Sequence, residues 1–258
     1  MGKRPNMRLN CLSKILNIIK RLSIWFWGNS IYPRNLTWIK LKEYIDNGRG
    51  PLVIPIGSLE GHGAHLPIDT DAIIASFVAD ELARRNEWIS LPPIIYTIAV
   101  PVRPGNIYIE PEVFGTYLSS IIKHFIEFGQ RRFVIVLGHG GPNIKNTVIS
   151  ICDDLCREHG VTIAVFHIAC ILNKLGLVDT SKDKHAGMWE TSMVMSIDTS
   201  LVGNLSIYKE TSPRRYGVVG DPLQASSETG YRYVEAVINY MENFIKSPKF
   251  KGCYYDWL

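Results

Sequence analysis

The regular alternation of short apolar runs with amphipathic segments is the feature that most constrains this chain. β-branched and other apolar residues fill the runs at 52–56, 132–137 and 161–168, with shorter runs at 89–91 and 94–100. Runs of this length and composition are typical of strands that are buried on both faces. Segments with helical periodicity lie between and around them, at residues 38–48, 71–85, 113–128, 144–158, 190–197 and 228–246. The alternation predicts one doubly wound, mostly parallel α/β domain.

The composition narrows the class of protein further. The chain has 258 residues, of which 46% are hydrophobic and 20% charged, as in ordinary globular domains. The net charge is +4, and much of the excess lies in the first forty residues, so no nucleic-acid surface is indicated. The five cysteines include no C-x-x-C pair, which favours reduced thiols and a cytoplasmic protein. Cys152 and Cys156, four apart on an expected helix, are more typical of core thiols than of metal ligands.

Residues 1–35 form a basic, amphipathic N-terminal extension to the main domain at 36–258. Lys14, Lys20 and Arg21 interrupt its apolar stretch, and no small-residue cleavage site follows, so it does not resemble a signal peptide. We interpret it as a helix that packs on the body of the protein or on a second subunit. Contact with a membrane surface is the alternative.

The segment from Gly57 to Asp71, directly after the first predicted strand, is rich in histidines, carboxylates and glycines. Glu60 and His62 are two apart, so in an extended segment both side chains can face one ion. Asp71 precedes a predicted helix and is either its N-cap or a carboxylate ligand that can bridge two metals. For His65 we favour a supporting role beside the ligands over direct ligation. The segment therefore predicts a divalent metal site.

A second part of this site is expected after the strand at 132–137. His139 lies there in a Gly-His-Gly-Gly turn, at the carboxyl end of a strand, where ligands bind in open α/β sheets. The alternatives for this turn are a histidine that only bonds loop backbone and a phosphate cradle. Glu60, His62, Asp71 and His139 together mix imidazole and carboxylate, which suits Zn, Mn or Fe(II), as one or two ions, better than Ca or Mg.

The polar cluster at 183–192 carries the expected acid–base chemistry. His185 has the residue type for a general acid or base near neutral pH. Glu190 is expected to orient His185, ligate a metal or activate a water, and the alternative is a carboxylate in the first turn of a helix. No P-loop, G-x-S-x-G or G-x-G-x-x-G pattern is present, so nucleophilic serine chemistry and dinucleotide binding are unsupported. His124, His159 and His167 are expected to be structural or surface residues.

Several separated motifs resemble those of the creatininase (creatinine amidohydrolase) family. They are Pro55–Gly63 with Asp71, Pro104-Gly105, Gly138–Gly141, Asp183-x-His185-Ala186-Gly187-x-x-Glu190-Thr191-Ser192 and Gly220-Asp221-Pro222. They follow one another in the family's order, and the resemblance covers roughly residues 36–246. The resemblance implies a three-layer α/β/α sandwich, a metal-dependent hydrolase of non-peptide C–N bonds, and often a homo-oligomer, commonly a hexamer.

The resemblance also implies roles for individual residues. Glu60, His62, Asp71 and His139 match metal ligands, Asp71 matches a bridging position, and His185 matches the proton donor to the leaving nitrogen. Glu190 belongs to the matching Glu-Thr-Ser motif.

The chain departs from the family pattern at a few positions. Leu137 replaces the usual Asn, Pro142 precedes Asn143, and Asn106 follows Gly105 where Thr is usual. Gly141 stands where creatininase itself has an acidic ligand, so Glu190 or water must complete a two-metal site.

From these residues we expect a metal-dependent amidohydrolase that attacks a small amide, cyclic amide or formamide with a metal-bound hydroxide. Creatinine is not the expected substrate. The alternatives are a formamidopyrimidine-nucleotide deformylase, for which Arg103, Lys145 and Arg214 or Arg215 would contact phosphate, and a non-catalytic binding member of the fold. The family also includes a peptidase of mycofactocin maturation.

Overall fold

The computed structural model describes residues 36–257. The predicted N-terminal helix, with its packing or membrane contact, lies outside the described residues. Within residues 36–257, no helix combines the length and the apolar character needed to cross a bilayer.

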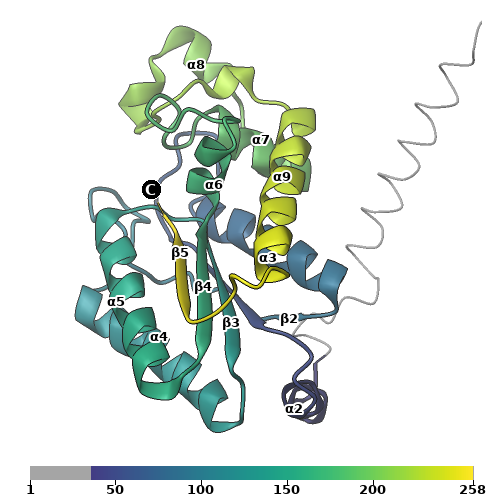
Figure 1. Ribbon diagram of the computed structural model, residues 1–258. Coiled ribbons are helices and arrows are strands. Elements are labelled where there is room, and N and C mark those ends of the chain that lie inside the picture. Colours follow the sequence, from purple (N-terminus) through teal and green to yellow (C-terminus); the bar gives the residue numbers. More distant parts are fainter. Residues whose placement is uncertain (1–35, 258) are drawn as a thin grey trace, which may run out of the picture. The chain divides into compact units, whose positions relative to one another are not determined.

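A five-stranded parallel sheet forms the centre of the domain (Figure 1). The strands run in the order β2-β1-β3-β4-β5, with bounds β2 (Ile89–Ser90), β1 (Leu52–Ile56), β3 (Arg132–Leu137), β4 (Thr162–His167) and β5 (Cys253–Asp256). The carboxyl ends of the three central strands are in register, because Ile56 pairs with Leu137 and Leu137 with His167. Chain segments that leave these strands therefore start side by side at one edge of the sheet. The predicted parallel sheet is confirmed.

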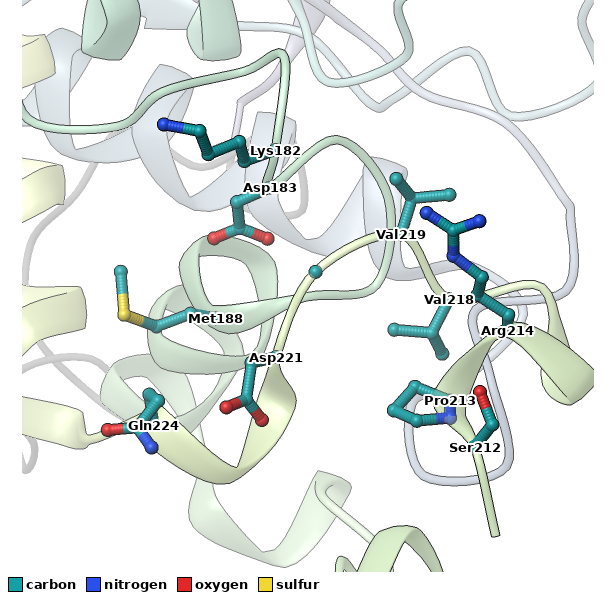
Figure 2. A pocket seen from close by; sticks show the side chains of 11 residues that line it. Lys182, Asp183, Met188, Ser212, Pro213, Arg214, Val218, Val219, Asp221 and Gln224 are labelled. Atoms are coloured by element: carbon teal, nitrogen blue, oxygen red, sulfur yellow. The ribbon is translucent and has the colours of Figure 1, made fainter.

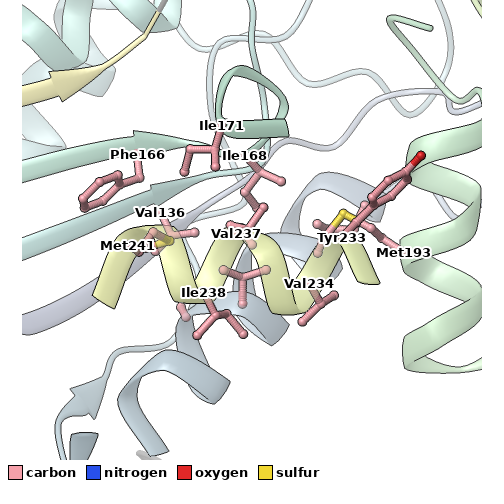
Figure 3. Packing of buried hydrophobic residues seen from close by; sticks show 14 of the residues in the cluster. Val136, Phe166, Ile168, Ile171, Met193, Tyr233, Val234, Val237, Ile238 and Met241 are labelled. Carbon is pink, nitrogen blue, oxygen red and sulfur yellow. The ribbon is translucent and has the colours of Figure 1, made fainter. Parts of the chain in front are cut away.

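Helices cover both faces of the sheet, which gives the expected three layers (Figure 1). The helices are α2 (Trp38–Asp46), α3 (Thr70–Asn86), α4 (Pro111–Glu127), α5 (Pro142–His159), α6 (Ile168–Lys174), α7 (Met188–Ile197), α8 (Ile207–Glu210) and α9 (Ser227–Ile245). Side chains alternate along each strand between two buried clusters. On β3, Val134 and Val136 enter the cluster shared with α3, α7 and α9, whereas Phe133 and Ile135 enter the cluster shared with α4 and α5. Figure 3 shows Val136 and Phe166 packed beside Val237, Ile238 and Met241 of α9.

The predicted elements differ from the structure in a few places. The apolar run at 94–100 forms only isolated pairings, Ile94 with Ile56 and Ile98 with Tyr108, because its chain leaves the sheet to form a loop. The chain end, residues 253–256, adds an edge strand that was not predicted. Helix α5 begins at Pro142 rather than at 144, since proline is well tolerated in the first turn of a helix.

Two of the cysteines are bonded, contrary to the expectation of reduced thiols. Cys156 of α5 and Cys253 of β5 form a disulfide across 97 residues of sequence. Cys152 is a buried free thiol, and Cys170 is also free. The disulfide fixes the edge strand to a helix of the neighbouring layer, and Cys156 is therefore not a core thiol.

We predict that reduction of this disulfide destabilises the protein. Closing so long a loop stabilises a fold by about 2–5 kcal/mol, chiefly through the entropy of the unfolded chain. Denaturation by guanidinium with and without dithiothreitol measures the effect. The double variant Cys156→Ser/Cys253→Ser is the control and should be insensitive to reductant. Equal thiol counts in the unfolded protein before and after reduction would contradict the bond.

Candidate metal centre

Two glycines at the strand ends bring the first turn of α3 against the sheet. A Cβ atom on Gly57 would lie 2.3 Å from the backbone nitrogen of Ala72, and one on Gly138 would lie 2.2 Å from the carbonyl oxygen of Asp71. No other residue leaves room for this approach. The first turn of α3 therefore lies across the ends of β1 and β3, and Asp71 lies between them.

The buried carboxylate of Asp71 is the central group of the site. Its Oδ1 lies 3.0 Å from His62 Nε2, and its Oδ2 lies 3.0 Å from His139 Nδ1. Ser58 Oγ donates a third bond to Oδ2, at 2.8 Å. Asp69, not Asp71, occupies the N-cap position of α3. The capping alternative for Asp71 is therefore wrong, and its carboxylate is directed at the two histidines.

Asp71 belongs to two overlapping groups of histidine and carboxylate side chains that are close enough together to hold a metal ion. Within each group one ligand atom per residue lies within 4.8 Å of the others. The groups are Glu60, Asp71 and His139, and His62, Asp71 and Glu190. The structure thus brings together all four predicted ligands and adds Glu190, whose Oε1 lies 3.9 Å from His62 Nε2. His185 joins at the border, with its Nδ1 3.7 Å from Glu60 Oε1.

Backbone carbonyls fix which nitrogen of each histidine faces the cluster. The Nδ1 of His62 lies 3.0 Å from the Glu60 carbonyl, and the Nε2 of His139 lies 3.2 Å from the Ile98 carbonyl. The Nε2 of His185 lies 3.0 Å from the Gly61 carbonyl. A carbonyl only accepts hydrogen bonds, so each of these nitrogens carries a proton and donates it. The other nitrogen of each ring is left to face the carboxylates, as in histidines that bind metals.

The electrostatics of the cluster favour a bound positive charge. Burial alone would lower the pKa of His62 and of His139, but Asp71 and its neighbouring carboxylates outweigh it and raise each pKa to about 10. Burial would also raise the pKa of Asp71, yet the two histidines hold it well below its usual range. Burial raises the pKa of Glu190 to about 8. Protons on the histidines take the place that a divalent cation would fill in this donor set.

His185 is electrostatically different from the other two histidines. Burial, together with the charge of His62, lowers its pKa. Its ring is therefore neutral near pH 7, with the Nε2 proton held by Gly61 and the Nδ1 lone pair facing the cluster. A neutral imidazole with one open nitrogen can take up a proton and pass it on.

Residues outside the ligand groups hold the segment from Gly57 to Asp71 in place through hydrogen bonds. The sequence patterns did not indicate most of these residues. His65 bonds Tyr208 and Thr191, each at 2.8 Å, and so ties this segment to the start of α7 beside Glu190. Both ring nitrogens of His65 are occupied by these two bonds, and its supporting role stays a prediction. Asn106 Oδ1 accepts a bond from the backbone N–H of Gly61 at 2.8 Å, and its Nδ2 donates to Val100.

His167, which was expected to be structural or at the surface, is buried at the end of β4. Its ring stacks on Trp257 at 4.9 Å. A Cβ atom on Gly140 would lie 2.7 Å from its Nε2. The ring therefore supports the turn that carries His139.

Residues 34–245 match the family model described as creatininase, creatinine amidohydrolase. The chain belongs to the creatininase family. The mycofactocin precursor peptide peptidase of Mycolicibacterium smegmatis is 28% identical over 229 residues, which cover 76% of this chain and 84% of the relative.

A second relative and a solved structure complete the comparison. The deformylase of Methanothermobacter marburgensis that acts on 2-amino-5-formylamino-6-ribosylaminopyrimidin-4(3H)-one 5'-monophosphate is 36% identical over 112 residues, or 41% of this chain and 47% of the relative. A manganese form of creatininase has the same fold, with a TM-score of 0.70 and 21% identity over 84% of this chain and 98% of that structure. This protein is therefore a hydrolase of carbon–nitrogen bonds.

We predict that Asn106 holds the Gly61 peptide, and with it His185. In Asn106→Ala the Gly61 amide loses its acceptor, so its hydrogen exchange should accelerate by roughly tenfold or more. Amide exchange followed by NMR measures this directly. Asn106→Asp keeps the oxygen acceptor and should retain protection. Equal exchange rates for Gly61 in Asn106→Ala and wild type would contradict the role.

Proposed function

We propose that this protein is a metal-dependent amidohydrolase that cleaves a C–N bond in a small amide, cyclic amide or formamide. The observation that carries the proposal is the position of Asp71, whose carboxylate belongs to both ligand groups. In each group the histidine donates the N–H that faces away from the carboxylates to a backbone carbonyl. Such a donor set is prepared for metal ions before any ion binds.

The residues fit two ions better than one. Glu60 and His139 would hold the first ion, His62 and Glu190 the second, and Asp71 would bridge them. Gly141 offers no carboxylate, so Glu190 takes the place of the acidic ligand that creatininase itself carries there. Zn, Mn and Fe(II) are the ions that suit mixed imidazole and carboxylate ligands. Ions bound there would lower the pKa of a water and polarise a substrate carbonyl.

The chain's own groups supply the proton transfers. His185 Nδ1 faces the cluster, and its Nε2–H is held by Gly61, so the ring presents one nitrogen to the reacting groups. We assign to this nitrogen the uptake of a proton from the attacking water and its delivery to the departing amine. The side chain of His185 is the most exposed of the cluster, which gives the substrate nitrogen access to it.

Two alternatives remain for this site. The first is deformylation of a formylamino pyrimidine nucleotide, favoured by the local likeness to the Methanothermobacter enzyme. The second is a binding protein that keeps the fold without turnover; the complete set of ligand groups speaks against it. The expected cytoplasmic location and homo-oligomer stay predictions, and the Cys156–Cys253 bond calls for a test of the compartment.

We predict that Glu60→Ala and His139→Ala each lose metal and activity together, because both side chains belong to the same ligand group. Metal content by mass spectrometry, with turnover of a panel of formamides, cyclic amides and small peptides, measures both effects. The exposed residues Glu228 and His159 give matched controls, Glu228→Ala and His159→Ala, which should keep metal and activity. Unchanged metal content in both site variants would contradict the assignment of Glu60 and His139 as metal ligands. A metal-loaded wild type without turnover would favour the alternative of a non-catalytic binding protein.

We predict that Glu190→Gln reduces the metal content from two ions to one per chain. The amide keeps the size of the side chain but removes the negative charge that the second ligand group supplies. Titration of metal-free protein with Mn²⁺, followed by calorimetry, should show the loss of one binding step. Two unchanged binding steps would place Glu190 outside the ligand set and restore its role in orienting His185.

A further inference from the structure

The metal centre opens to solvent at His185. The side chain of His185 is 25% exposed, whereas the side chains of the five ligand residues are between 0% and 11% exposed. A substrate that reaches the ligand groups therefore passes His185. Residues that flank this histidine on the open side are placed to recognise the part of the substrate that lies outside the metal centre.

Arg103 is such a residue; its side chain passes Gly61, and its guanidinium lies close against Gly217. Its Cδ lies 3.6 Å from the position of a Cβ atom on Gly61. A Cβ atom on Gly217 would lie 2.2 Å from Nη1 and 2.7 Å from Nη2 of Arg103. The side chain thus extends from Gly61 to Gly217, where the guanidinium occupies the space that a Cβ atom would take.

Both glycines belong to segments that hold His185. The carbonyl of Gly61 accepts the Nε2–H of His185. Val219, two residues after Gly217, exchanges backbone hydrogen bonds of 2.8 and 3.1 Å with His185. Arg103 connects these two segments, so its guanidinium lies beside the chain that carries His185.

Within the described part of the chain, the charge of Arg103 is not matched by a carboxylate. Arg84 and Arg85 pair with Glu81, and Arg157 pairs with Asp154. Among residues 36–257, no ion pair joins Arg103 to an acidic side chain, although the residue is exposed. A guanidinium that is positioned by packing alone keeps its planar set of donors for an external oxyanion.

We propose that Arg103 binds a carboxylate or phosphate group of the substrate, so that the hydrolysed compound is an amide with an anionic group near the scissile bond. The proposal rests on the function assigned above to the metal centre. It extends that function by naming the chemical class of substrate and the residue that selects it.

A neighbouring cavity is a poorer site for such a group. It has a volume of about 470 Å³, and Arg214 lies at one end of it with Ser212 and Pro213 (Figure 2). Asp183 and Asp221 line its other part, so an anion there would meet two carboxylates. Arg103 is not among its lining residues.

Chelating probes test the proposal without requiring turnover. The monohydroxamates of succinic, glutaric and adipic acid carry a metal-binding hydroxamate at one end and a carboxylate at the other. Matched probes carry a terminal phosphonate or a neutral terminal carboxamide. Binding to metal-loaded protein is measured by calorimetry. At the best chain length, the anionic probes should bind about tenfold more tightly than the carboxamide, and the stronger of the two anions identifies carboxylate or phosphate as the group.

Variants connect this preference to Arg103. Arg103→Ala should abolish the preference for anionic probes and leave binding of the carboxamide unchanged. Gly217→Ala should reduce the preference for anionic probes although Arg103 is present, because the new methyl group displaces the guanidinium. Gly176→Ala is the matched control, since Gly176 also has a positive φ, of 68°, but a Cβ atom there meets nothing within 4 Å. Arg232→Ala, on the exposed side of α9, controls for a general loss of positive charge.

The outcomes separate this proposal from the proposed function. If neither anionic nor neutral hydroxamates bind the metal-loaded protein, the metal centre is wrong, and the role of Arg103 falls with it. If the hydroxamates bind with no preference for anionic ends, or if the preference survives in Arg103→Ala, the metal centre stands and the role of Arg103 is overturned.

Discussion

The structure of this site depends on the approach of the first turn of α3 to the ends of two strands. A buried carboxylate is costly unless it is paired, and Asp71 is paired on both oxygens. Its position is possible only because Gly57 and Gly138 carry no side chains at the contact. The same contact delivers His62 and His139 from different strand connections to one carboxylate. Packing of backbone against backbone, rather than any single ligand, therefore sets the geometry of the metal centre.

Much of this arrangement follows from sequence patterns. The strand ends at Ile56 and Leu137, with polar segments directly after them, sufficed to predict the sheet edge and the four candidate ligand residues that the structure brings together there. Glu190 was assigned to several roles because its position depends on α7 reaching the sheet from far along the chain. Periodicity gives the existence of such a helix but not its place in space. For the same reason the roles of Asn106 and Tyr208 were not predicted, since both act through hydrogen bonds to residues far away in the sequence.

The structure gives a physical reason for two of the departures from the family pattern, at Pro142 and Gly141. Pro142 begins helix α5, where the missing N–H of proline costs no helical bond. A side chain at Gly141 would meet the His139 ring, with a Cβ atom 2.9 Å from Nε2. A carboxylate supplied by α7 avoids this conflict. Glu190 thus brings an acidic group to the candidate site from α7, while the neighbours of His139 in its turn are glycines.

The last described residues of the chain contact the turn that carries His139 through one other side chain. Trp257 stacks on His167, and the ring of His167 lies against Gly140, the neighbour of His139. The disulfide of Cys253 anchors the same strand four residues earlier. The C-terminal strand is therefore part of the wall behind the metal centre, although it lies at the edge of the sheet (Figure 1). A change at Trp257 would therefore reach the turn that carries His139 through the ring of His167, although the three residues are far apart in the sequence.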